Sequence, residues 1–300
     1  MLSILIPVYN FDVTELVNEL NNQAKIENVP YEIILMDDAS DNNFKNINKS
    51  CEQINNVTYI ELPSNIGRAK IRNKLASMSK YDNLLFIDCD SKIFNDFYIE
   101  SYLNNLNDNL VLCGGRIYEI SAPVKKELYL RWLYGTKREC ANAGIRNINP
   151  NNSFMTNNFI ISKSLIQKLQ FDENIENYGH EDTLFGIELK KNNITIKHID
   201  NPLIHIGLES SDEFIEKTKE GISNLVYILK YYKDKNQLIS GIKLLKWYYI
   251  VNKLLLNKPV LILFKISEKY LLKNLKSKNP KLLFFDFYKL GYLCSKINVR

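Results

Sequence analysis

The segment Leu84-Leu85-Phe86-Ile87-Asp88-Cys89-Asp90 is the most informative part of the chain, because an apolar run ends there in two carboxylates. A short apolar run with a polar end is typical of a buried strand that leaves the core. Alternate residues of an extended segment point the same way, so Asp88 and Asp90 can face one ligand while Cys89 faces away. Paired carboxylates suit a divalent cation, although an isolated Asp-x-Asp is also an ordinary strand cap or turn.

The first 115 residues alternate short apolar runs with amphipathic stretches. The expected strands are 2–8, 32–36, 57–62, 84–88 and 110–113. The expected helices are 13–23, 44–54, 67–78 and 97–106. This alternation predicts an α/β fold with a mostly parallel, Rossmann-like central sheet flanked by helices.

Polar residues follow three of these predicted strands. They are Pro7-Val8-Tyr9-Asn10, Asp37-Asp38-Ala39-Ser40 and Asp88-Cys89-Asp90. Open parallel sheets bind ligands beyond the carboxyl ends of their strands, so these segments are expected to form one rim. Residues 116–160 are less regular, and we expect a lid or an acceptor loop there.

The composition excludes several classes of protein. The five cysteines are scattered without a Cys-x-x-Cys motif, which argues against a disulfide framework or a zinc site and favours a reducing compartment. Residues 1–7 lack a basic region and a cleavage site, so they indicate a first strand and not a signal peptide. No run of 18 apolar residues suggests a membrane span. We therefore expect a cytoplasmic protein.

The overall charge of +5 is unevenly distributed. Residues 221–300 hold 16 Lys and Arg against 3 Asp and Glu, a net charge of +13, which leaves −8 for residues 1–220. We expect a catalytic domain over 1–210 and a basic, all-helical extension over 211–300. Ser210 and Glu213 resemble a capping box that opens the first of its helices. Further helices are expected around 239–256, 260–275 and 282–294, separated by Pro259 and Pro280.

The basic extension permits two interpretations. Its lysines alternate with Leu, Ile, Tyr and Phe, a pattern suited to an anionic membrane surface on the inner face of the plasma membrane. The alternative is a helical bundle that packs on the catalytic domain or on another subunit, with its lysines simply solvated. Nucleic acid is not an expected partner, because the body of the chain is acidic.

Five motifs in register resemble a known family. They are Pro7–Asn10, Asp37–Ser40, Asn65-Ile66-Gly67 with Arg72-Asn73, Asp88-Cys89-Asp90 and Glu181-Asp182. Together they resemble the family 2 inverting glycosyltransferases of bacterial type, over about residues 1–210. The resemblance implies the GT-A fold, a nucleotide-sugar donor with UDP favoured, and a glycan or lipid-linked acceptor of a cell-envelope polysaccharide pathway. It leaves hexosyl and N-acetylhexosaminyl transfer both open.

The resemblance also implies a donor site and a metal site. It assigns the nucleotide-sugar to Pro7, Val8, Tyr9, Asp37, Asn65, Gly67, Arg72, Asp88, Cys89 and Asn158. Asp37 would accept a hydrogen bond from a uracil ring, and Asp88 would lie near the ribose. Asp90, with His205 as a further ligand, would hold Mn²⁺ or Mg²⁺, although His205 can equally be a core histidine with a backbone partner.

Glu181 and Asp182 match the catalytic end of the family pattern. Asp182 would take the proton of the attacking hydroxyl, and Glu181 would position the acceptor. The alternative is an acidic pair that complements a helix N-terminus. A non-catalytic nucleotide-sugar or glycan-binding module of the same fold is the competing function, but such a module would be expected to lose these acids. A dinucleotide enzyme is excluded, because no glycine-rich loop follows the first strand.

Overall fold

The computed structural model describes residues 1–106, 111–175 and 178–297, and the chain forms two compact units. The first comprises Met1–Glu119, Cys140–Glu176 and Glu181–Gly207, and the second Ile120–Glu139, Asn177–His180 and Leu208–Arg300. The sequence predicts a single boundary at 210, close to the last of these transitions. It does not indicate that residues 120–139 group with the C-terminal helices.

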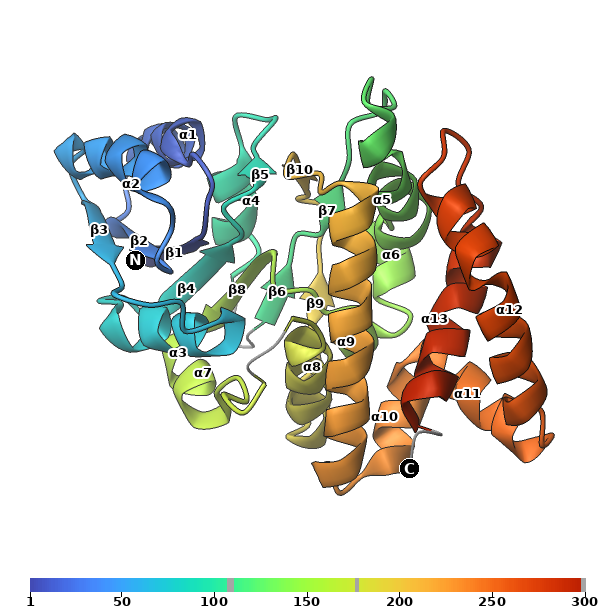
Figure 1. The fold of residues 1–300 in the computed structure, drawn as a ribbon. Helices are drawn as coiled ribbons and strands as arrows, with labels where there is room; N and C mark the ends of the chain where they lie inside the picture. Colours follow the sequence, from blue (N-terminus) through green and yellow to red (C-terminus); the bar gives the residue numbers. More distant parts are fainter. Residues whose placement is uncertain (107–110, 176–177, 298–300) are drawn as a thin grey trace. The chain divides into compact units, whose positions relative to one another are not determined.

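A central sheet organises the first unit (Figure 1). Its strands are β1 (Leu2–Val8), β2 (Tyr31–Asp37), β3 (Val57–Glu61), β4 (Asn83–Ile87), β6 (Val111–Cys113), β8 (Asn158–Ser162) and β9 (Lys197–His198). Among the described residues their order is β3-β2-β1-β4-β8-β6-β9, and β8 runs antiparallel to both of its neighbours while the other pairings are parallel. The predicted α/β fold with a mostly parallel sheet is confirmed.

Helices cover both faces of this sheet. They are α1 (Thr14–Ile26), α2 (Asn42–Asn48), α3 (Arg68–Met78), α4 (Tyr98–Leu103), α6 (Ala143–Arg146), α7 (Lys163–Leu169) and α8 (Glu181–Lys191). Even-numbered residues of β1 pack with α1 and α4, whereas Leu5 of β1 packs on the other side with α3, α7 and α8. Because both faces are buried, β1 is almost continuously apolar, as expected of a central parallel strand.

A small second sheet lies in the same unit. It consists of β5 (Ser91–Lys92), β10 (Leu203–His205) and β7 (Arg116–Ile117), in the order β5-β10-β7. In the antiparallel β5–β10 pair, His205 is opposite Ser91. These short strands are not among the elements predicted from the sequence. The pairing of β5 with β10 places Ser91, and with it the adjacent Asp90, next to His205, although the two strands are more than a hundred residues apart in sequence.

Most differences from the predicted elements are local. The expected helix over 44–54 is instead α2 followed by a 3₁₀ turn, Lys49–Gln53. β8 falls in the stretch that was expected to be an irregular loop. The predicted strand over 110–113 begins at Leu110, which is outside the described residues, and its remainder is β6.

The second unit is helical. Its helices are α5 (Tyr129–Tyr134), α9 (Ser211–Tyr231), α10 (Lys235–Gly241), α11 (Lys243–Lys253), α12 (Asn257–Leu275) and α13 (Leu282–Ile297), with a π-helical turn at Gly135–Glu139. Apolar residues of α5, α9, α12 and α13 share one core. A Cβ at Gly291 of α13 would lie 2.4 Å from the Phe264 ring, so the missing side chain lets α12 and α13 approach closely.

Two predictions about helix ends have clear outcomes in this unit. The capping box at the start of α9 is confirmed: Ser210 Oγ accepts from Glu213 N, and Glu213 Oε2 accepts from Ser210 N. Pro259 does not separate two helices as predicted. It lies in the first turn of α12, where a missing N–H costs no helical hydrogen bond. None of the described helices is long and apolar enough to cross a bilayer.

Candidate active site

The loops that follow β1 and β2 are joined by hydrogen bonds. Val8 O accepts from Asp38 N at 2.8 Å, and Ser40 Oγ accepts from Asn10 N at 2.8 Å. Between these anchors, Pro7 is half-buried, Val8 is buried and Tyr9 is exposed. The carboxyl ends of the two strands therefore form one rigid edge, as predicted, and Tyr9 offers an aromatic face at that edge.

Asp37 is fully buried at the end of β2. Its Oδ1 accepts from Ser40 N at 2.7 Å, and its Oδ2 accepts from Tyr59 OH at 3.0 Å. A carboxylate has about four acceptor positions, so two remain in principle. The hydrogen bond that we expect from a uracil ring would thus be the third one accepted by the Asp37 carboxylate, which already holds the turn after β2 through Ser40.

The adjacent Asp38 holds the turn before α3. Its two oxygens accept from Ile66 N at 2.7 Å and from Gly67 N at 3.2 Å. Gly67 has φ +82°, a left-handed conformation that favours glycine, and it is the residue before α3. Asn65 is exposed, and its Oδ1 also accepts from Gly67 N. The Asn65-Ile66-Gly67 motif therefore sets the direction in which α3 begins.

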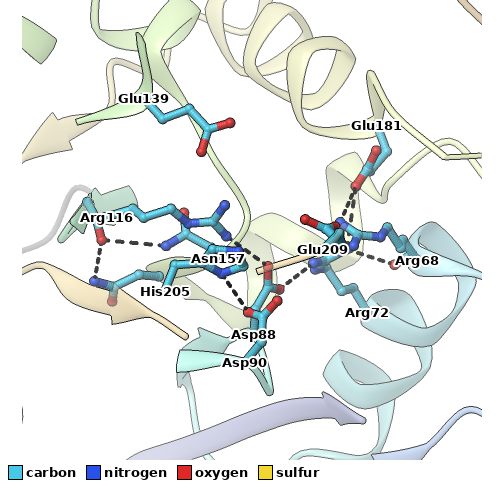
Figure 2. Close-up of polar contacts among 12 residues, drawn as sticks. Arg68, Arg72, Asp88, Asp90, Arg116, Glu139, Asn157, Glu181, His205 and Glu209 are labelled. Atoms are coloured by element: carbon cyan, nitrogen blue, oxygen red, sulfur yellow. Dashed lines mark hydrogen bonds and ion pairs between the residues drawn. The ribbon is translucent and has the colours of Figure 1, made fainter. Parts of the chain in front are cut away.

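Arg72 of α3 meets Asp88 at the end of β4 (Figure 2). Arg72 Nη2 lies 2.8 Å from Asp88 Oδ1, and Arg116 Nη2 of β7 lies 3.5 Å from Asp88 Oδ2. The Arg72 side chain is buried, so the pair is not a surface ion pair of small effect. The Asp88 carboxylate is thus already neutralised by two guanidinium groups.

Asp90 meets His205 across the β5–β10 pair (Figure 2). His205 Nδ1 lies 3.3 Å from Asp90 Oδ1, and Ile206 N donates to Asp90 O at 2.9 Å. A Cβ at Gly207 would lie 2.6 Å from Asp90 Cβ, so only glycine allows the chain to pass here. Burial acts to raise the pKa of Asp90, but His205, Arg116 and Arg68 outweigh it and hold the pKa well below its usual range.

Asp90 and His205 together offer buried donor atoms that could hold a cation. Asp90 Oδ1 and His205 Nδ1 are buried and face each other at 3.3 Å, and neither makes another hydrogen bond within the described parts of the chain, where His205 Nε2 is buried without one. A carboxylate oxygen and an imidazole nitrogen are donors that Mn²⁺ accepts. The described residues contain no cluster of three or more His, Cys, Asp or Glu able to hold a metal. The residues present therefore fit a cation that takes its remaining ligands from elsewhere, such as a diphosphate.

Cys89 lies in a turn after β4 ends at Ile87, so the predicted strand alternation does not extend to it. It packs against the core on the α1 side of the sheet, and burial raises the pKa of its thiol to about 12. The thiol is therefore neutral near pH 7.

The Asn157-Asn158 pair requires a correction. Asn158 Oδ1 accepts from Tyr98 OH and Tyr102 OH, and its Nδ2 donates to Gly115 O and Asn201 O. These four bonds use the whole capacity of the amide, so the Asn158 side chain has no hydrogen bond left for a donor. Asn157 Oδ1, by contrast, is buried and has no hydrogen-bond partner in the described chain.

Glu181 is the first residue of α8, and its side chain is buried. Its Oε1 lies 3.8 Å from Arg72 Nη1 and 3.8 Å from Arg68 Nη1 (Figure 2). Arg72 therefore contacts Asp88 with one nitrogen and Glu181 with another. The predicted donor and acceptor ends of the site share this one guanidinium.

Asp182 follows Glu181 in the first turn of α8. Its Oδ1 accepts from Thr183 N at 2.6 Å and from Thr183 Oγ1 at 3.2 Å. Burial, and then the charge of Glu181, raises the pKa of Asp182 to about 6, against smaller opposing effects of Thr183 and Arg72. A carboxylate tuned upward in this way is suited to accept a proton near neutral pH.

Asn73 connects α3 with the segment before α8. Its Nδ2 donates to Phe171 O and Glu173 Oε1, and its Oδ1 accepts from Phe171 N at 2.9 Å. Arg72 thus contacts the carboxylates of Asp88 and Glu181, and Asn73 anchors the segment that precedes α8.

The predicted site residues largely come together in the first unit. Arg72 joins Asp88 to Glu181, and His205 pairs with Asp90, whose pKa is also lowered by Arg116 and Arg68. The positive charge of Arg72 acts as well to lower the pKa of the neighbouring Asp182. Sequence reasoning missed Arg116, left Arg68 unassigned and chose Asn158 over Asn157. The one sequence signal for Arg116 is its position directly after Gly114-Gly115, at the end of a predicted strand.

Comparison with known proteins gives a family match. The family described as "Glycosyl transferase family 2" matches residues 3–169. A chondroitin synthase from Pasteurella multocida (strain Pm70) is 27% identical over 225 residues, which cover 63% of this chain and 23% of that protein. The chain therefore spans about a quarter of that relative's length.

Solved structures share the fold. A mannosyltransferase from Pyrobaculum calidifontis, in complex with GDP-Man and Mn²⁺, has a TM-score of 0.61 at 11% identity, covering 99% of this chain and 85% of that one. TarS 1–349 from S. aureus, in complex with UDP-GlcNAc, has a TM-score of 0.50 at 17% identity, covering 97% and 90%. At these identities the likeness concerns the fold alone.

Proposed function

The chain belongs to glycosyl transferase family 2, and we propose that it transfers a sugar from a nucleotide-sugar donor to a hydroxyl group of a glycan or lipid-linked acceptor, with inversion at the anomeric carbon. The observation that carries this proposal is the charged network around Arg72. It joins Asp88 to the buried Glu181, and Arg116 and Arg68, which contact these two carboxylates, also act on Asp90, the partner of His205.

The donor end is built to hold a nucleoside diphosphate. Asp90 and His205 would hold Mn²⁺ or Mg²⁺, which would neutralise the charge that develops on the diphosphate leaving group. Arg68 and Arg116 add positive charge close to Asp88 and Asp90. Asp88, fixed by Arg72, would accept a hydrogen bond from the ribose, and Asn157 Oδ1 would accept one from a donor hydroxyl.

The nucleoside would lie against the edge formed by Pro7, Val8 and Tyr9, with Asp37 and the Asn65–Gly67 turn on its other side. The solved structures with a similar fold contain UDP-GlcNAc or GDP-Man, so donors of both nucleotides are worth testing. We favour UDP, because Asp37 retains acceptor capacity for the N–H of a uracil ring.

The acceptor end supplies the base. The acceptor hydroxyl attacks the anomeric carbon as the bond to the diphosphate breaks, and Asp182 takes the hydroxyl proton. Its raised pKa makes it a stronger base than an ordinary aspartate while it remains ionised at neutral pH. Glu181, held by Arg72 and Arg68, would orient the acceptor and leave Asp182 as the proton acceptor.

A donor panel tests the proposal. The full-length chain is incubated with UDP- and GDP-sugars and Mn²⁺, and the release of nucleoside diphosphate by slow hydrolysis is recorded without acceptor. We expect release from one donor, loss of release on chelation, and loss in Asp90→Asn. Tight donor binding with no release, with or without saccharide acceptors, would support the non-catalytic module instead.

A further inference from the structure

Helices α11 and α12 carry an apolar surface that no described residue covers. It consists of Trp247, Ile250, Leu254, Leu255, Leu256, Ile262, Leu263, Ile266 and Tyr270, all of them exposed. We name it the α11–α12 surface. It lies entirely in the second unit and takes no part in the chemistry proposed above.

The surface is an organised helix face and not a scatter of single residues. On α12, Ile262, Ile266 and Tyr270 recur at intervals of four and lie on one side, with Ile266 77% exposed. The opposite side of α12, with Phe264, Leu271 and Leu275, is buried in the core of the second unit. α12 is therefore apolar on two faces, and internal packing accounts for only one of them.

The turn between the two helices makes the case stronger. Leu255 is 86% exposed and has φ +57°, a conformation that suits Asn or Gly and is unfavourable for Leu. Leu255 is therefore neither buried in the core nor favoured by its backbone conformation, so packing within the described chain does not account for a leucine at this position. Its neighbours Leu254 and Leu256 are exposed as well, so three adjacent leucines project from one turn.

The charges that flank this surface have one sign. From residue 243 to residue 276 the chain carries eight lysines, at 243, 246, 253, 258, 265, 269, 273 and 276, and a single acidic residue, Glu268. Helical geometry places Lys258, Lys265, Lys269 and Lys273 along one flank of the exposed face of α12. A second copy of the same surface would bring these lysines together, which like-charge repulsion opposes.

We propose that the α11–α12 surface binds an anionic phospholipid bilayer, with the Leu254–Leu256 turn inserted below the headgroups. A bilayer offers both complements at once, a plane of negative charge for the lysines and an apolar layer for the leucines. Trp247 and Tyr270 are amphipathic rings suited to the boundary between these layers. The inference is independent of the proposed sugar transfer, because it rests on surface residues of the second unit.

Vesicle flotation of the full-length chain tests the proposal. The probes are vesicles of phosphatidylcholine alone and of an equal mixture with phosphatidylglycerol. We expect the chain to float with the mixed vesicles only, and less at high salt. The fluorescence of Trp247, which is 61% exposed, should shift to shorter wavelength on binding, and Trp247→Phe should remove the shift while flotation persists.

Two pairs of matched variants separate the contributions. Leu255→Asn with Ile266→Gln should weaken binding about tenfold or more, and Asn fits the backbone at 255. Its control, Ile120→Gln with Val124→Gln, changes two fully exposed apolar residues elsewhere and should bind normally.

The second pair tests the charges. Replacing Lys258, Lys265 and Lys269 by Gln should weaken binding on the order of 100-fold, at about fivefold for each lysine. The same change at Lys25, Lys49 and Lys74, which are exposed in the first unit, should have little effect.

The outcomes that overturn the proposal are equally specific. Absence of flotation with mixed vesicles would refute it, as would equal binding by the surface variants and their controls. If the chain instead forms a dimer without lipid, and Leu255→Asn with Ile266→Gln abolishes that dimer, the surface is an interface between copies. Capture by an acidic protein partner without any vesicle binding would also reject the membrane.

Discussion

Replacing Asp182 with asparagine should abolish transfer and at the same time stabilise the protein. Burial and the neighbouring Glu181 raise the pKa of Asp182 from 3.8 to about 6. At about 1.4 kcal/mol per pH unit, the ionised side chain destabilises the folded state by about 3 kcal/mol. The substituted asparagine side chain would carry no charge, and its Oδ1 could still accept the hydrogen bonds from Thr183.

The sign of the pH dependence follows from the raised pKa. Well below pH 4, Asp182 is protonated in both the folded and the unfolded state, so wild type and Asp182→Asn should be equally stable. The folded state holds its proton up to pH 6, and stability is therefore lost as the pH rises through that range. Above pH 6, Asp182→Asn should melt on the order of 6 °C higher than wild type. Transfer by wild type should rise through the same range, because the base must be ionised.

Thermal melts at pH 4 and pH 8, with turnover measured on the same samples, provide the test. Glu52→Gln, which removes an exposed carboxylate, serves as the control and should change neither quantity. A loss of activity on the order of 100-fold or more is expected of a missing general base. Near-normal turnover of Asp182→Asn would refute its role as the base. If the Tm difference between wild type and Asp182→Asn were the same at both pH values, the destabilisation that we assign to the ionised Asp182 side chain would be refuted.

Three further substitutions have defined consequences. Asp90→Asn should weaken Mn²⁺-dependent donor binding on the order of 100-fold while binding of the metal-free nucleotide is retained, as measured by calorimetry. Arg72→Met should lower stability by about 3 kcal/mol, because it removes the buried partner shared by Asp88 and Glu181 and leaves Asp88 with Arg116 and Glu181 with Arg68 alone, whereas Arg68→Met should cost less than about 1 kcal/mol; thermal melts that show equal losses would contradict this. Gly186→Ala should lower stability by about 1–3 kcal/mol, since its Cβ would lie 2.4 Å from Asn151 O, whereas Gly144→Ala meets only Asn142 Oδ1 at 3.4 Å and should be tolerated in the same assay.

The regular half of the fold was predictable because its signals are local. β1, β2 and β4 are apolar runs with polar ends, and the alternation of strands and helices leaves few topologies. β8 was missed because its short apolar run lies in an asparagine-rich stretch that resembles a loop. Its antiparallel direction also departs from the alternation that made the other strands recognisable.

The candidate site residues could be named from the sequence, whereas several of the contacts that they make could not. Asp88 and Asp90 follow from strand alternation, whereas the contact of Asp90 with His205 depends on two very short strands that are far apart in sequence. Sequence could not decide between Asn157 and Asn158 either, because the choice depends on which amide meets Tyr98 and Tyr102. Contacts made by buried polar groups are set by tertiary structure and leave no periodic signal.

The position of Arg72 between Asp88 and Glu181 has a consequence for the interpretation of mutants. One cation serves as counterion to a carboxylate at each end of the site, so neither end is energetically independent of the other. A double-mutant cycle on Asp88 and Glu181 should therefore be non-additive, even though we assign the two carboxylates to different substrates. Loss of either acid leaves surplus positive charge for the other, and a defect in donor binding can thus originate at the acceptor end.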